Sequence, residues 1–388
     1  MVNSASPFRV RLLTKADPTL TGTSRYARDL ARGLEAAGLD VSLDFLALGP
    51  GLHSMAHGLK RLGIDLGAFF ASYPLRAHLK SADIYHITTQ TMATLLWLQR
   101  FPAPVLVTVL DIIPYAARGD RALDTARHRL ESLFYRLALA GLRRADALVA
   151  ISHYTRDTLV HSLNLPPERI HVVHPGVDRE RFRPVEVPQT FWDRYRLDPA
   201  CQHLLYVGSE DPRKNLRTLL RALALVARQI GDVRLIKVGK AHFVQERQRL
   251  LALAGDLGIG GHILFLDQVP DEDLVYFYNA ASVLAMPSLY EGFGLPVAEA
   301  MACGLPVVCA DRTSLPEVAG DAGLLVDPRR VDDLAAVLQQ VLEDKSLAAS
   351  LRDAGLARVA LFDLERTAGQ LVDLYTRLLS PSQSLEAK

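Results

Sequence analysis

Apolar segments of strand length alternate with amphipathic segments of helix length along most of the chain. The first of them, Arg9–Thr14, leads through a polar loop into a predicted helix over Ser24–Gly38. Such alternation predicts a parallel sheet covered by helices on both faces. The other predicted strands of the first half are Val41–Leu48, Asp83–Thr89, Pro104–Asp111, Ala145–Ser152 and Arg169–Gly176, and its other predicted helices are Met92–Gln99, Leu123–Leu142 and Tyr154–Asn164.

The alternation stops between Pro184 and Asp198, where prolines, charges and aromatic residues gather, and then starts again. This break predicts a linker, with one domain over residues 1–190, a second over 191–365, and a C-terminal helix within 366–388 that crosses back toward the first. The predicted strands of the second half are His203–Gly208, Val233–Gly239, His262–Val269, Ser282–Ser288 and Leu305–Ala310, and its predicted helices are Leu216–Ile230, Val244–Gly255, Asp271–Ala280, Pro296–Cys303, Asp332–Leu342 and Leu364–Leu379.

Composition agrees with two ordinary globular domains. The 388 residues are 49% hydrophobic and 22% charged, which excludes a disordered or fibrous chain. The net charge of +1 provides no overall field for binding nucleic acid. The three cysteines form no CxxC pair, and no pattern at the start resembles a secretory signal, so a cytoplasmic location is expected.

One polar loop follows the predicted strand His203–Gly208 and holds two adjacent cations, Arg213 and Lys214. A loop that opens a helix and carries such cations suits a diphosphate that gains charge when a bond to it breaks. A solvated turn in which both cations pair with Glu210 and Asp211 is the alternative interpretation.

A second loop follows the predicted strand Ser282–Ser288 and carries Glu291, two glycines and, after Pro296 at the expected helix start, Glu299. Glycines allow backbone N–H groups to approach a ligand closely. Carboxylates accept hydrogen bonds from sugar or ribose hydroxyls. The two loops together therefore indicate a site for a sugar joined to a diphosphate.

The spacing of Glu291 and Glu299 has the E-x7-E form, and the run from Glu291 to Glu299 resembles that of retaining glycosyltransferases of family 4. The resemblance implies the α/β GT-B fold, in which two Rossmann-like, doubly wound parallel-sheet domains face a central cleft. It extends over nearly the whole chain, through Thr21-Gly22-Thr23, Ala150-Ile151-Ser152, Pro175-Gly176-Val177-Asp178, Pro212-Arg213-Lys214-Asn215, Val269-Pro270-Asp271, Tyr278 and Ala302-Cys303-Gly304-Leu305-Pro306.

The resemblance also implies roles for individual residues. Glu299 would hold the donor ribose and Glu291 the transferred sugar, while Arg213 and Lys214 would neutralise the departing diphosphate. Catalytic roles thus fall to Arg213, Lys214 and Glu291. The other implied substrate-binding residues, besides Glu299, are Gly22, Asp111, Ser209, Gly292, Phe293, Gly294 and Leu295.

Two positions depart from the family's pattern. Leu110 stands before Asp111 where many relatives have a histidine, which would contact the sugar's 6-hydroxyl, so Asp111 is expected to take its place. Ser209 replaces an arginine that some members have. Because of both changes, the resemblance does not identify the donor sugar.

The expected activity is metal-independent, retaining transfer of a mannose- or glucose-type hexose from a GDP- or UDP-sugar to a glycan, lipid-linked or small-molecule acceptor, with no cofactor. Asp271 and Asp273 imitate a metal-binding D-x-D but stand at a predicted helix start, where acids stabilise the helix dipole. A nucleotide-sugar epimerase, a phosphorylase of the same fold, and a catalytically silent carbohydrate-binding protein are the alternatives.

Peripheral contact of the first domain with the inner face of a membrane is compatible with two stretches, His53–Lys80 and Leu123–Arg144. Both combine basic residues with apolar ones, and such a face can adsorb on anionic lipid. A core-packed helix with a solvated edge explains either stretch equally well.

Overall fold

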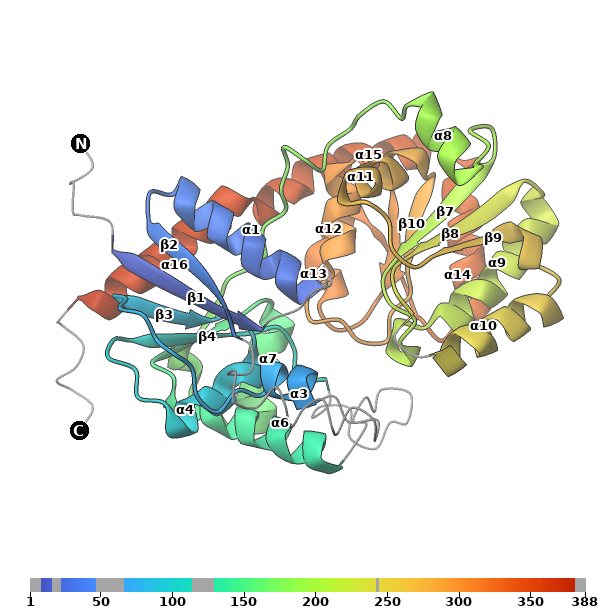
Figure 1. Ribbon diagram of the computed structural model, residues 1–388. Coiled ribbons are helices and arrows are strands. Elements are labelled where there is room, and N and C mark those ends of the chain that lie inside the picture. Colours follow the sequence, from blue (N-terminus) through green and yellow to red (C-terminus); the bar gives the residue numbers. More distant parts are fainter. Residues whose placement is uncertain (1–7, 16–21, 47–65, 114–128, 242–243, 381–388) are drawn as a thin grey trace. The chain divides into compact units, whose positions relative to one another are not determined.

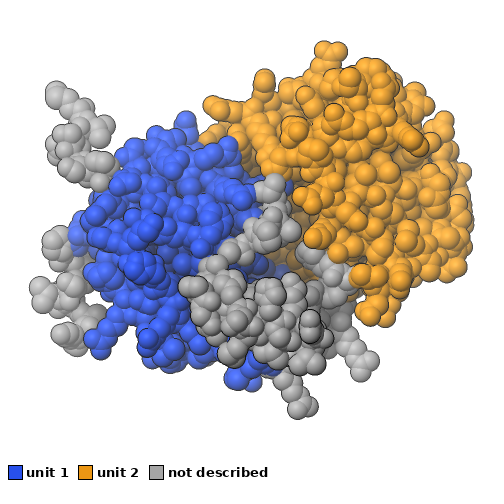
Figure 2. All heavy atoms as spheres, viewed as in Figure 1, with its two compact units in different colours: residues 1–118, 124–176, 364–388 blue, residues 119–123, 177–363 orange. Residues whose placement is uncertain are grey.

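The computed structural model describes residues 8–15, 22–46, 66–113, 129–241 and 244–380. The chain divides into two compact units, shown in different colours in Figure 2. Among the described residues, unit 1 contains those up to Gly176 together with 364–380, and unit 2 contains Val177–Asp363. Each unit is built on a six-stranded sheet in which all pairs of neighbouring strands are parallel, as the alternation predicts (Figure 1).

The sheet of unit 1 has the strand order β2-β1-β3-β4-β5-β6. Its central strands β3 and β4 are buried along their whole length because helices cover both faces of the sheet. The strands are β1 (Arg9–Lys15), β2 (Asp40–Leu46), β3 (Ile84–Ile87), β4 (Val105–Val109), β5 (Ala147–Ala150) and β6 (Ile170–Val172).

Helices α1 and α16 pack together in unit 1 (Figure 1). The end of α1 is set by Gly38, whose φ of +87° is in the left-handed region that glycine adopts without strain. The helices of unit 1 are α1 (Gly22–Ala36), α3 (Leu66–Ser72), α4 (Leu95–Leu98), α6 (Arg129–Gly141), α7 (His153–Leu163) and α16 (Leu364–Leu379).

The sheet of unit 2 has the order β12-β11-β10-β7-β8-β9. The chain runs outward from β7 through β8 to β9 and then returns to β10 on the other side of β7. The crevice at the carboxyl ends of β7 and β10 is therefore the topological switch point, where open α/β sheets bind ligands. The strands are β7 (Gln202–Val207), β8 (Val233–Val238), β9 (Ile263–Leu266), β10 (Val283–Met286), β11 (Val307–Ala310) and β12 (Leu324–Val326).

The apolar core of unit 2 joins the sheet to α9 and α14, with Leu219, Leu223, Leu334 and Leu338 fully buried. Helices α11 and α12 contact the same sheet through β7, β10 and β11. The helices of unit 2 are α8 (Gln189–Tyr195), α9 (Leu216–Ile230), α10 (Val244–Asp256), α11 (Asp271–Ala280), α12 (Leu295–Ala302), α13 (Leu315–Ala319), α14 (Val331–Glu343) and α15 (Lys345–Arg358).

Several predicted elements differ from the observed ones. The segment predicted as an irregular linker contains α8, because Phe191 packs edge-to-face against Phe277 with ring centroids 4.8 Å apart. Helix α15 and strand β12 were not predicted at all. Thr21, residues 53–65 of the stretch His53–Lys80 and the start of Leu123–Arg144 lie outside the described residues.

A chain of buried polar side chains connects α16 to the sheet of unit 1. The imidazole of His86, on β3, is hydrogen-bonded through Nδ1 to the hydroxyl of Tyr375 at 2.6 Å and through Nε2 to that of Thr108 at 2.7 Å. Burial lowers the pKa of His86 to about 3, so the folded protein holds this ring neutral.

This buried histidine makes the stability of unit 1 depend on pH. An unfolded histidine titrates near 6.5, so the free energy of unfolding should fall as the pH drops from about 6.5 toward 3, by up to about 1.4 kcal/mol per pH unit. His86→Gln removes the titrating group and should flatten this dependence.

Urea unfolding at several pH values measures the effect. The two tryptophans fall one in each unit, so fluorescence of Trp97 in a Trp192→Phe background reports on unit 1. The same background with His86→Gln is the comparison. Parallel pH profiles for the two proteins would contradict the assignment of the titration to His86.

Candidate functional site

The two loops singled out in the sequence meet at the switch point of unit 2. Lys214 Nζ donates a hydrogen bond to Glu291 Oε1 at 2.5 Å, and Arg213 Nη1 lies 3.6 Å from Glu291 Oε2. Arg213 also donates to the backbone oxygen of Tyr290. Both cations therefore pair with the acid of the second loop, and Glu210, one of the two partners that the alternative names, pairs with Lys237 and Arg247 instead.

Burial gives this ion pair unusual electrostatics. The side chains of Lys214 and Glu291 are 11% and 8% exposed. Burial lowers the pKa of Lys214, and the charge of Glu291 offsets that only in part. For Glu291, burial acts to raise the pKa, but the charges of Lys214 and Arg213 outweigh it and hold the pKa below its usual range. Glu291 is thus ionised and holds both cations in place.

Asn215 fixes the end of the cation loop. Its backbone is left-handed, with φ of +59°, between the short 3-10 helix Pro212–Lys214 and α9. Its side-chain amide donates to the backbone oxygens of Pro287 and Pro328 at 3.0 and 2.6 Å. The loop after β7 is thereby tied to the loop after β10.

Glu299 lies one turn inside α12, which begins at Leu295, one residue before the predicted start. Its side chain is almost fully buried, and Tyr278 on α11 donates a hydrogen bond to Glu299 Oε2 at 2.6 Å. Glu291 lies in the loop before the helix. Because one carboxylate is in the loop and the other is inside the helix, the two can bind different groups of one ligand.

The glycine loop between them is held by Ser314 and Thr313, neither of which was predicted as a site residue. Ser314 donates to the backbone oxygens of Glu291 and Phe293, and Glu291 N–H donates to Thr313 Oγ1 at 3.1 Å. Thr313 has a φ of +57°, which is costly for a β-branched residue. Gly294 requires glycine for its own part, because its φ is +110° and a Cβ would lie 2.7 Å from Leu315 Cδ2.

A second ion-pair cluster anchors the start of the cation loop. Glu210 and Lys237 are both fully buried and lie 2.6 Å apart, and Arg247 forks onto both oxygens of Glu210. Arg247 also pairs with Asp267. This cluster was not predicted, although Lys237 stands among the apolar residues of strand β8 and a buried ammonium needs a partner.

The two aspartates that imitate a D-x-D metal site are paired with other side chains of unit 2. Asp273, nearly buried, accepts hydrogen bonds from Arg194 at 2.7 Å and from the hydroxyl of Tyr195 at 2.6 Å. Asp271 lies 3.7 Å from Arg181. These partners give both acids a structural role at the start of α11.

The remaining predicted substrate-binding residues lie in different places. In unit 2, Ser209 directly follows the Gly208 turn and donates to Asp211, while Gly292, Phe293 and Leu295 belong to the glycine loop. In unit 1, Gly22 is the first residue of α1, and Asp111 follows β4 and accepts from Ile113 N–H. The structure brings Arg213, Lys214 and Glu291 into direct contact, and Glu299 lies one turn inside α12, the helix that follows the glycine loop. The roles of Gly22 and Asp111 stay predictions.

Leu110 marks the departure from the family's pattern in unit 1. Its backbone N–H donates to Gln90 Oε1 at 3.1 Å, and Gln90 is a buried residue that begins the 3-10 helix after β3. Gln90 was not selected from the sequence, because a single glutamine after a strand carries no distinguishing pattern.

Comparison with known families matches both halves of the chain. Residues 196–358 match the family described as glycosyl transferases group 1, and residues 20–181 match glycosyltransferase family 4. The second match covers the part of unit 1 that holds Gly22 and Asp111. The first covers the loops that hold both cations and both glutamates.

Curated relatives include several mannosyltransferases. The chain is 34% identical over 281 residues to the O-antigen chain mannosyltransferase B of Escherichia coli, a match that covers 70% of each protein. It is 30% identical over 282 residues to a serotype-specific mannosyltransferase WbdA of the same organism, but covers only 34% of that longer protein. A D-inositol 3-phosphate glycosyltransferase of Rhodococcus jostii is 35% identical over 237 residues, 60% of this chain and 52% of that protein.

Solved structures share the fold over nearly the whole chain. Sucrose-phosphate synthase of Thermosynechococcus elongatus matches with a TM-score of 0.73 and 26% identity, covering 96% of this chain and 99% of that one. Anabaena HepE, solved with UDP and glucose, matches with a TM-score of 0.72 at 19% identity, covering 95% and 100%. Within the part of the chain that the structure describes, none of the helices has both the length and the apolar character needed to cross a bilayer.

Proposed function

The chain belongs to glycosyltransferase family 4, whose members are retaining hexosyltransferases, and from this premise we propose that it transfers mannose from a nucleotide diphosphate sugar to a glycan acceptor. The observation that carries the proposal is the contact of Arg213 and Lys214 with Glu291 at the switch point. This contact supports the proposal because two cations, which suit a diphosphate, lie beside a carboxylate, which suits the hydroxyls of a sugar. The mannosyltransferase names of its curated relatives support mannose over other hexoses.

In this proposal the ion pair changes partners when the donor binds. The donor diphosphate takes over Arg213 and Lys214, and Glu291 then accepts a hydrogen bond from a hydroxyl of the sugar. Glu299, held by Tyr278, accepts from the ribose, and the backbone N–H groups of the glycine loop face the sugar and phosphate. The roles of Gly22, Asp111 and Ser209 at the donor complete the proposed site.

The transfer itself needs position and charge more than a covalent nucleophile. The bond from the anomeric carbon to the diphosphate oxygen breaks while the acceptor oxygen attacks from the same face, and the acceptor's proton passes to a donor phosphate oxygen. Arg213 and Lys214 stabilise the negative charge that appears on the diphosphate, and Glu291 stabilises the positive charge that appears on the sugar.

We also propose that unit 1 contacts a membrane surface. On α6, Leu130 and Leu133 are 50% and 60% exposed, next to an exposed Arg136. Exposed leucines beside a basic residue favour adsorption on anionic lipid. A lipid-linked glycan would then be presented to unit 1 at that surface.

The direct test of the activity is an assay of nucleotide diphosphate release with GDP-mannose and UDP-glucose, each with and without a mannan oligosaccharide. We expect release from GDP-mannose that depends on the acceptor and is unchanged by excess EDTA, because the protein's own cations neutralise the diphosphate. Release without acceptor would point to hydrolysis, and isomerised donor without release to an epimerase. Activity lost in EDTA and restored by Mg²⁺ would contradict the metal-independent mechanism.

Replacement of the two cations tests their proposed role. Arg213→Ala and Lys214→Ala should each lower kcat about 10²–10³-fold, the usual cost of losing one preorganised donor to developing charge. Arg221→Ala, which removes an exposed arginine farther along α9, is the matched control and should leave kcat unchanged. If both site variants turn over at the control rate, the cation loop does not take part in the reaction.

Glu299→Gln tests the separate role of the second carboxylate. A ribose contact is present before and during the reaction, so its loss should weaken nucleotide diphosphate and nucleotide sugar about equally, raising KM with a smaller effect on kcat. Calorimetry with the nucleotide and steady-state kinetics measure both quantities, with Glu272→Gln on the exposed side of α11 as control. A variant that binds the nucleotide normally but has lost kcat would place Glu299 at the sugar instead.

A further inference from the structure

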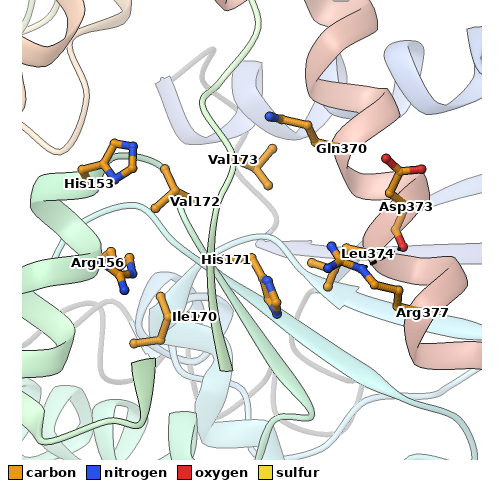
Figure 3. Close-up of a pocket in the computed structure, with 10 residues that line it drawn as sticks. All are labelled: His153, Arg156, Ile170, His171, Val172, Val173, Gln370, Asp373, Leu374 and Arg377. Atoms are coloured by element: carbon orange, nitrogen blue, oxygen red, sulfur yellow. Dashed lines mark hydrogen bonds between the residues drawn. The ribbon is translucent and has the colours of Figure 1, made fainter. Parts of the chain in front are cut away.

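Outside the donor site, charged side chains gather in each unit. In unit 1 they line a groove of about 380 Å³ between α7, β6 and α16, where Arg156 and Arg377 lie on opposite sides of β6 with His171 between them (Figure 3). That arrangement does not bring the two cations together on one group. In unit 2, by contrast, charged side chains form a closed cluster that includes the start of the cation loop, and each cation of this cluster contacts an acid.

This charge cluster consists of the side chains of Glu210, Lys237, Arg247 and Asp267. Lys237 Nζ lies 2.6 Å from Glu210 Oε1 and also donates to the backbone oxygen of Gly239. Arg247 donates through Nε to both oxygens of Glu210, at 2.8 and 2.9 Å, and pairs with Asp267. Both cations thus hold the one carboxylate of Glu210.

The charge cluster connects the cation loop to the sheet of unit 2. Glu210 is the third residue after β7, Lys237 lies within β8, and Asp267 directly follows β9. These three strands are neighbours in the sheet, and because they are parallel their carboxyl ends meet at the same edge. Arg247 adds a contact from α10. The start of the loop is therefore connected to three strands and a helix.

Complete burial makes this cluster costly unless each charge keeps its partner. Glu210 and Lys237 are both fully buried. Burial lowers the pKa of Lys237, and its hydrogen bond to Glu210 offsets that only in part. A buried ion pair is often no more stabilising than apolar residues of similar volume. The presence of this pair at the start of the cation loop therefore points to a role in holding the loop and not to a gain in stability.

The chain between Glu210 and the two cations is short and constrained. Only two residues separate Glu210 from Arg213, and the second of them is Pro212. The proline ring fixes φ at the start of the short 3-10 helix Pro212–Lys214, whose last N–H donates to the backbone oxygen of Asp211 at 2.8 Å. A shift of Glu210 would therefore move both cations.

We propose that Glu210 is a positioning residue for the transfer reaction, held by Lys237 and Arg247 so that the two cations of the loop are aligned before a diphosphate arrives. The inference rests on the proposed glycosyl transfer, because it concerns the same cations. Glu210 itself pairs with no group of the sugar nucleotide and acts only through Arg213 and Lys214. Charges that are fixed beforehand stabilise a developing charge without reorganisation at the moment of reaction, so loss of the charge cluster should lower kcat.

Two variants separate positioning from stability. Glu210→Gln leaves Lys237 as a buried charge without its acid, so it should lower the free energy of unfolding of unit 2. Glu210→Gln combined with Lys237→Met removes both charges, while Arg247 keeps Asp267, so the double variant should regain most of that stability. In both variants, kcat with GDP-mannose and a mannan oligosaccharide should fall about 10- to 100-fold, the scale of a small misplacement of a catalytic group.

Glu246→Gln is the matched control, because Glu246 is also buried in unit 2 and Arg217 donates to both of its oxygens, at 2.8 and 2.7 Å. This pair joins α9 to α10 and includes no residue of the cation loop. Urea unfolding, followed by the fluorescence of Trp192 in a Trp97→Phe background, should show a loss of stability in the control, while its kcat stays unchanged.

Two results with the double variant would overturn the proposal. One is a kcat that recovers together with the free energy of unfolding. The other is a double variant too unstable to assay, because the charge cluster would then be needed for the fold itself and not for the position of the cations.

Calorimetry with GDP keeps this test apart from that of the activity. An unaltered protein that binds GDP but does not release it from GDP-mannose would contradict the proposed function. Even then, the double variant should bind GDP more weakly than the unaltered protein, because its cations are misplaced. In a Lys214→Ala background the same double replacement should weaken GDP binding by a clearly smaller factor, since one of the cations through which Glu210 acts is gone. Equal factors in the two backgrounds would contradict the positioning role.

Discussion

The buried contact of Lys214 with Glu291 is the interaction on which the candidate site depends. A lysine and a glutamate that are almost removed from water stabilise each other only while they stay paired, because either alone would be an uncompensated buried charge. The pair joins the loop after β7 to the loop after β10 across the switch point. In the proposed exchange, an incoming diphosphate would replace Glu291 as the partner of the cations, and the sugar that comes with it would offer Glu291 new hydrogen bonds. On this proposal the donor replaces both partners of the contact that it breaks.

The surrounding structure keeps this exchange local. Glu210, buried between Lys237 and Arg247, holds the start of the cation loop, while Asn215 holds its end through two backbone oxygens. The glycine loop is held by Ser314 and by Thr313. The left-handed backbone of Thr313 is strained, and the surrounding structure holds it in that conformation. With both loops fixed at their ends, a change of partners moves side chains and leaves the backbone in place. Such preorganisation is what stabilisation of a developing charge requires.

Much of the fold could be predicted because strands of a parallel sheet are buried on both faces and stand out as apolar runs. Helices α9, α11 and α16 were placed with their observed bounds for a related reason, since each has a clear start and a stripe of buried positions. Helix α8 was missed because Pro184 and Pro188, which precede it, and the charges around it resemble a linker, whereas Phe191 anchors it to Phe277. Both loops of the site could be found from their residue types. The partner of Lys214 could not, because nearby Glu210 and distant Glu291 offer the same carboxylate and only the folded chain decides between them.

Binding of the nucleotide diphosphate without its sugar tests the exchange of partners most directly. Calorimetry at pH 7 should compare the unaltered protein with Glu291→Gln, using Lys214→Ala as the variant that must lose affinity. The account predicts that Glu291→Gln binds the nucleotide diphosphate at least as tightly as the unaltered protein, because the cations no longer have to leave an ionised partner. A clear loss of affinity in Glu291→Gln, matching that of Lys214→Ala, would show that Glu291 supports the diphosphate site and does not compete with the diphosphate for its cations.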